Sequence, residues 1–103
     1  MKKIQDTITK IKLNNYRTIT KKAFEIARKN IVKTKSKKRQ LQVKEILQMV
    51  ECYINDSEFF EKKQDYVNAF AALNYSHGWL DAGARLGYFN VKDKDPNSEF
   101  FAV

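Results

Sequence analysis

The sequence predicts an all-α protein, an up-down-up antiparallel three-helix bundle with a short C-terminal tail. Its first 77 residues contain neither glycine nor proline, whereas β-sandwiches and meanders need turn signals about every 8–12 residues. Apolar residues recur at three- and four-residue spacing in three long segments, which is typical of amphipathic helices. The polar segments 33–38 and 61–65 separate them. Because both connections are short, we expect neighbouring helices to be antiparallel.

The first predicted helix spans about residues 3–33. At 1.5 Å per residue it would be roughly 46 Å long, so we expect it to extend beyond its neighbours. Its apolar residues follow helical spacing with one change of phase around residues 14–16: Ile4, Ile8, Ile11, Ile19, Ala23, Ile26, Ala27 and Ile31.

The second predicted helix spans about residues 37–62, and Ser36 is its expected N-cap. We expect Cys52, beside the apolar stripe, to be buried as a small hydrophobic residue, since no basic neighbour one turn away lowers its pKa. As the single cysteine of the chain, it also excludes an internal disulfide framework and a paired-cysteine metal site. The apolar stripe is Val43, Ile46, Leu47, Val50, Tyr53, Ile54, Ser57 and Phe60.

The third predicted helix spans about residues 65–88 and completes a single domain of residues 1–88. Asp65 can cap its first turn and Gly87 suits its C-terminal cap. Gly78 and Gly83 then lie inside the helix, each at a cost of about 1 kcal/mol relative to alanine. Residues 89–103, with the turn-forming segment 95–98, are the expected tail.

The third helix has little polar surface, because Asp81 and Arg85 are the charged residues between positions 66 and 91. A helix of a three-helix bundle buries about half of its circumference, whereas this one is apolar most of the way round. The tail with Phe89, Phe100 and Phe101, a second copy of the chain, or a partner helix could cover the remainder. The expected interaction surface is Trp79, Leu86, Tyr75 and Ala72.

Residues 65–87 read DYVNAFAALNYSHGWLDAGARLG. This segment resembles the signature of a small archaeal family, domain of unknown function 357, with the pattern DYVNAFAALNY-x-x-GWLDAG-x-RLG. The first two helices resemble the family only in length and pattern, so the resemblance covers about residues 10–89. It implies an archaeal three-helix bundle and no assigned activity. Family members carry a proline or glycine between the first two helices. In this chain the corresponding segment, residues 33–39, contains neither.

The sequence offers no catalytic, cofactor-binding or metal-binding motif. His77, the single histidine, lies on an apolar stripe, where a hydrogen-bonded core role is favoured over proton transfer. Asp81 and Arg85 form an i, i+4 pair of opposite charge, with Asn74 two turns from Asp81. We expect a buried polar network of Asn74, Asp81 and Arg85, and the alternative is a small-ligand pocket over Gly78.

The net charge of +8 comes from the first part of the chain. Residues 1–39 hold fourteen Lys and Arg against Asp6 and Glu25, a net of +12, whereas residues 40–103 have a net of −4. Cations at the start of a helix oppose its dipole, and a phosphate there would relieve the conflict. A solvated basic loop is the alternative. The expected anion-binding residues are Lys33, Lys35, Lys37, Lys38 and Arg39.

Together these features predict a non-enzymatic helical module that associates with itself, as a homodimer, or with a protein partner through the third helix. The alternative function is binding of RNA or DNA phosphates, without sequence preference, by the basic first helix and residues 33–39. No apolar run approaches the roughly 18 residues of a membrane span, and no signal-peptide core follows Met1. We therefore expect a soluble cytoplasmic protein.

Overall fold

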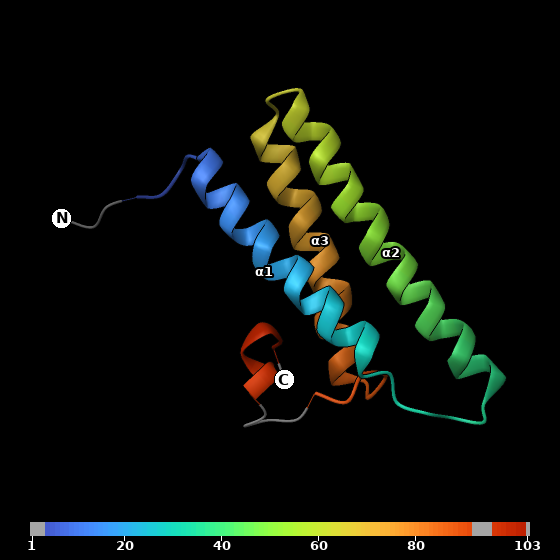
Figure 1. Cartoon of the computed structure of the whole chain (residues 1–103). Helices are drawn as coiled ribbons and strands as arrows, with labels where there is room; N and C mark the ends of the chain where they lie inside the picture. The colour runs from blue at the N-terminus through green and yellow to red at the C-terminus, as the bar shows by residue number, and fades with distance from the viewer. Residues whose placement is uncertain (1–3, 92–95, 103) are drawn as a thin grey trace.

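The computed structural model of the chain, which describes residues 4–91 and 96–102, is an all-α bundle of three helices (Figure 1). The helices are α1 (Lys10–Lys29), α2 (Lys37–Lys62) and α3 (Tyr66–Arg85), and a short 3₁₀ helix, η1 (Pro96–Phe100), follows. Helix α3 packs along α2 and also on α1, whereas α1 and α2 touch each other much less. Successive helices run in opposite directions (Figure 1), so the up-down-up order expected from the short connections is correct.

Helix α1 is shorter at both ends than the predicted 3–33, and residue 3 lies outside the described residues. It begins after Thr9, whose hydroxyl accepts a hydrogen bond from the Lys12 amide at 3.1 Å. It ends at Lys29, with Asn30 as its C-cap, and the backbone that follows pairs with the segment after α3. The Val32 amide donates to the Tyr88 carbonyl at 2.9 Å, and Ile31 forms an antiparallel bridge with Phe89.

The ends of α2 and α3 follow the predicted caps. Ser36 accepts from the Arg39 amide at 3.2 Å, and Asp65 accepts from the Asn68 amide at 3.2 Å. Gly87, with φ of 81°, ends α3 in a Schellman motif in which the Tyr88 amide donates to the Gly83 carbonyl at 2.9 Å. Helix α2 thus has the predicted bounds, and α3 ends at Arg85 instead of residue 88.

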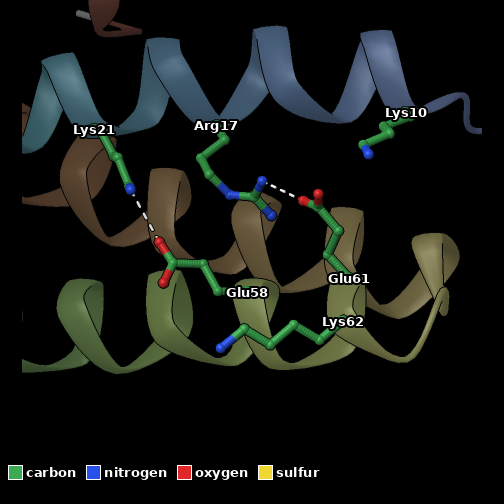
Figure 2. Close-up of a pocket in the computed structure, with 6 residues that line it drawn as sticks. All are labelled: Lys10, Arg17, Lys21, Glu58, Glu61 and Lys62. Atoms are coloured by element: carbon green, nitrogen blue, oxygen red, sulfur yellow. Dashed lines mark hydrogen bonds and ion pairs between the residues drawn. The ribbon is translucent and has the colours of Figure 1, made fainter.

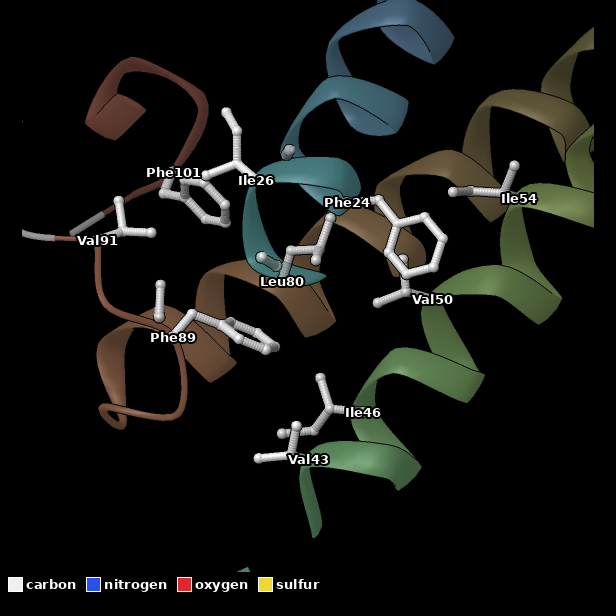
Figure 3. Close-up of a cluster of buried hydrophobic side chains, with 13 residues drawn as sticks. Phe24, Ile26, Val43, Ile46, Val50, Ile54, Leu80, Phe89, Val91 and Phe101 are labelled. Atoms are coloured by element: carbon white, nitrogen blue, oxygen red, sulfur yellow. The ribbon is translucent and has the colours of Figure 1, made fainter. Parts of the chain in front are cut away.

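The main core gathers one side of each helix around residues that follow α3 (Figure 3). Phe89 is fully buried beside Gly83, where a Cβ atom would collide with the Phe89 ring. Val91 and Phe101 are buried in the same cluster. The core therefore continues past residue 88, into the expected tail. Its other members are Ala23, Phe24, Ile26, Ala27, Val43, Ile46, Val50, Ile54, Leu80 and Ala84.

The expectation of a buried Cys52 is wrong, because its side chain is exposed. The buried stripe of α2 contains Val50 and Ile54, and at about 100° per residue Cys52 lies on the opposite side of the helix. Residues four positions apart can thus be buried while the residue midway between them faces solvent.

Candidate functional site: the outward face of α3

Helix α3 keeps one broad side exposed to solvent, which we call the outward face. Four large apolar side chains remain accessible on it: Val67 is 69% exposed, Tyr75 64%, Leu86 67% and Trp79 37%. Arg85 is the single charged residue of the face. The outward face is Val67, Ala71, Asn74, Tyr75, Gly78, Trp79, Ala82, Arg85 and Leu86.

Three of the four expected interaction residues, Trp79, Leu86 and Tyr75, lie together on this face. Ala72 does not, because it is 5% exposed and belongs to the buried side of α3. Its position between Ala69 and Ser76 at helical spacing places it toward the core.

The relief of the outward face is shallow. A hollow of about 290 Å³ lies over Gly78 and is lined by Asn74, Tyr75, Gly78, Trp79 and Ala82. A smaller hollow of about 140 Å³ lies at the border with α2, where the rings of Tyr53 and Tyr75 have centroids 5.5 Å apart. These aromatic rings and small residues form a surface suited to contact with another apolar surface.

The expected buried network of Asn74, Asp81 and Arg85 is wrong. Asn74 and Arg85 are both exposed. Asp81 is half-buried and accepts from the Ala102 amide at 2.9 Å, with His77 Nε2 3.7 Å away. The C-terminal segment thus supplies a partner for this carboxylate, and Arg85 lies in solvent.

His77 is hydrogen-bonded on both ring nitrogens, as expected for a structural histidine. Its Nδ1 lies 3.1 Å from the Thr20 hydroxyl of α1, and its Nε2 lies 2.8 Å from the Phe100 carbonyl. The neighbouring Tyr16 has a pKa raised above its ordinary value, chiefly by burial and also by the negative charge of Asp81. Through these hydrogen bonds, His77 and Asp81 of α3 connect α3 to α1 and to the C-terminal segment.

The seam between α1 and α2 carries a cluster of paired charges (Figure 2). Arg17 forms an ion pair with Glu61, and Lys21 Nζ lies 2.9 Å from Glu58 Oε1. The hydrogen bond from Lys21 lowers the pKa of the Glu58 carboxyl below its ordinary value. The signal in the sequence was the basic first helix next to an acidic side of the second. The hollow has a volume of about 490 Å³ and is lined by Lys10, Arg17, Lys21, Glu58, Glu61 and Lys62.

The five expected anion-binding residues do not all have the same surroundings in the structure. Lys33, Lys35, Lys37 and Lys38 are exposed around the connection between α1 and α2. Arg39 instead stacks on the Tyr88 ring, with its guanidinium carbon 4.3 Å from the centroid, and lies 3.5 Å from the Gly87 carbonyl. Arg39 therefore joins the start of α2 to the end of α3.

Within residues 4–91 and 96–102, no group of three or more His, Cys, Asp or Glu side chains is placed to hold a metal ion. In the same part of the chain, the helices are too polar or too short to span a membrane.

Comparison with known proteins gives one family. No curated protein and no solved structure matches the chain. The family model for the protein of unknown function DUF357 matches residues 15–89. This range includes α2, α3 and most of α1. Because the match covers well over half of the chain, the protein belongs to the DUF357 family.

Proposed function

We propose that this protein is a non-enzymatic helical interaction module that binds an apolar protein surface through the outward face of α3. The observation that carries the proposal is the exposure of four large apolar side chains on a face with a single charge. A helix face that remains in water is ordinarily rich in charged and polar residues. An apolar face of this kind marks a contact surface.

The solvent side of α1 shows what a hydrated helix face of this chain looks like. Lys22, Glu25, Arg28 and Lys29 are all exposed on it. The scarcity of charge on the outward face of α3 is therefore a local property of that face and does not reflect the composition of the whole chain.

The described C-terminal residues, 87–91 and 96–102, leave the outward face open. Phe89 and Phe101 are buried in the main core, and η1 packs against α1. The tail was one of the three segments or partners expected to cover the third helix. It packs instead against the main core and α1. A second copy or another protein is then the remaining candidate.

The test compares Val67→Glu with Ile11→Glu. Both are highly exposed aliphatic residues at the second position of a helix, at 69% and 74% exposure, and an acidic residue is well tolerated in a first turn. Light scattering after gel filtration measures self-association at micromolar concentration. Affinity capture from native extract, treated with nuclease, measures binding to other proteins.

We expect Val67→Glu to lose self-association or a captured protein that both the wild type and Ile11→Glu retain. A wild type that stays at 12 kDa and captures the same proteins as both variants would overturn the proposal. Circular dichroism of the variants checks that each keeps its helices.

Binding of nucleic-acid phosphates is a second candidate function. Lys33, Lys35, Lys37 and Lys38 are exposed, and none forms an ion pair with a carboxylate in the described residues. The first turn of α2 also has no acidic residue. These cations could contact about three or four phosphates, so log affinity would fall with log salt at a slope of about −2 to −4.

Charge reversal tests this second function. We expect a triple variant, Lys35→Glu, Lys37→Glu and Lys38→Glu, to lose binding of labelled RNA and DNA. Arg39 is kept because it stacks on Tyr88. Lys62→Glu with Lys63→Glu, at the other end of α2, is the control. Equal binding by the triple variant and the wild type would exclude this function.

A further inference from the structure

The three glycines of the chain differ in whether the folded chain needs a glycine at that position. Gly83 lies against the Phe89 ring, and Gly87 has a φ of 81°. Gly78 has neither constraint: a Cβ atom there would meet nothing within 4 Å. Glycine inside a helix costs about 1 kcal/mol relative to alanine. Nothing within the described chain explains this cost, whereas close approach of a second surface would.

Apart from Trp79, the apolar and small residues of the outward face have a spacing that reads the same in both directions along the helix. Successive intervals are four, four, three, four and four residues, and the inner four positions have the alternating spacing of a coiled-coil seam. The series is Val67, Ala71, Tyr75, Gly78, Ala82 and Leu86. A surface of this kind is complementary to itself when two copies meet with opposite direction.

We propose that the partner of the outward face is a second copy of this chain, whose α3 packs antiparallel to the first. This inference rests on the proposed function and names its partner. With the twofold axis between positions 76 and 77, Tyr75 lies level with Gly78 of the second copy and Ala71 with Ala82. Each copy uses the same patch, as in other twofold interfaces. The missing side chain of Gly78 gives room for the Tyr75 ring.

The distribution of charge favours this face over the others for contact between two copies. Each chain has a net charge of +8, with +12 from residues 1–39 and −4 from residues 40–103, so two copies repel each other least through a face with little charge. Arg85 is the single cation of the outward face. In the antiparallel register it lies level with Asn68 of the second copy. There Asn68 Nδ2 is 2.7 Å from the carboxylate of Asp65, which offers a negative charge near Arg85.

Disulfide cross-linking of two differently tagged chains tests the register. Both carry Cys52→Ser, because Cys52 is exposed, and one carries Ala71→Cys while the other carries Ala82→Cys. In the proposed register these two cysteines are level. Two copies of either single variant would hold their cysteines roughly 16 Å apart along the helix axis, too far for the Cα separation of about 4.4–6.8 Å in a disulfide.

We expect the mixture to form the mixed disulfide and each variant alone to form little. Homotypic disulfides would indicate parallel pairing and overturn the proposal, as would a dimer by light scattering that forms no mixed disulfide. A chain that is monomeric but captures another protein in a Val67→Glu-sensitive manner would overturn the second copy as partner and leave the proposed function standing. Ala82→Cys mixed with Leu41→Cys, an exposed position on α2, is the control for random collision.

Discussion

The two sides of α3 contain similar kinds of residues and have opposite surroundings. The inner side buries Ala69, Leu73, Ser76, Leu80 and Gly83, and the outward face leaves Val67, Ala82 and Leu86 accessible. Both sides mix aliphatic and small residues. The composition of a helix face therefore does not decide its burial, which depends on the elements that reach it.

Glycine shows the difference between the two sides in a single residue type. Gly83 on the inner side is in contact with Phe89, whereas Gly78 on the outward face has open space around it. The same substitution at the two positions should therefore have opposite effects on the stability of the monomer. Substitutions on the two sides can therefore measure how tightly the inner side is packed and how little the monomer needs the residues of the outward face.

The largest effect is expected from Phe89→Ala. Phe89 is fully buried against the inner side of α3, and removal of its ring leaves a cavity that should lower the free energy of unfolding by about 3–5 kcal/mol. Urea unfolding measures this loss. Phe59→Ala, which removes a ring that is 54% exposed, is the control. Equal losses in the two variants would mean that Phe89 does not close the inner side.

Gly83→Ala should cost less, about 1–3 kcal/mol from overpacking, of which the higher helix propensity of alanine offsets about 1 kcal/mol. The added methyl group collides with the Phe89 ring, and overpacking of a core forces side chains from their preferred positions. If this variant were as stable as the wild type in thermal unfolding, the tight contact between α3 and the segment after it would be refuted.

Gly78→Ala should have the opposite sign and stabilise the monomer by about 1 kcal/mol. Alanine has the higher helix propensity, and its methyl group meets no neighbour in the chain. The measurement belongs at a protein concentration at which the wild type is monomeric. A destabilised monomer would show that Gly78 is needed within the single chain and would remove one argument for a second copy.

The smallest effects are expected from Asp81→Ala and Arg85→Ala. Asp81 accepts from the Ala102 amide near the surface, so its loss should cost only about 0.5 kcal/mol, at the low end for a hydrogen bond, and hydrogen exchange at the Ala102 amide should accelerate. Arg85 is exposed, so its replacement should change stability by less than about 0.5 kcal/mol. A large loss in both variants would restore the buried pair expected from the sequence.

Several features of the molecule were predictable from the sequence because they depend on close neighbours. Ser36, Asp65 and Gly87 cap helices through contacts within a few residues, and the bounds of α2 followed from such signals. The exposure of Trp79 and Leu86 was only one of several possibilities, since the tail could have covered the same face. Arg39 was grouped with the lysines by charge, although its contact with Tyr88 joins residues far apart in sequence.

The sequence by itself determined that three helices form, the bounds of α2, and that the third helix has more apolar surface than a three-helix bundle buries, because spacing and caps act over one or two turns. Only the tertiary structure decided which side of α3 stays open. That choice depends on contacts such as Ile31 with Phe89 and Thr20 with His77, which join distant segments and leave no mark in local spacing. Once these contacts place the C-terminal segment against the inner side of α3 and against α1, the outward face remains in solvent.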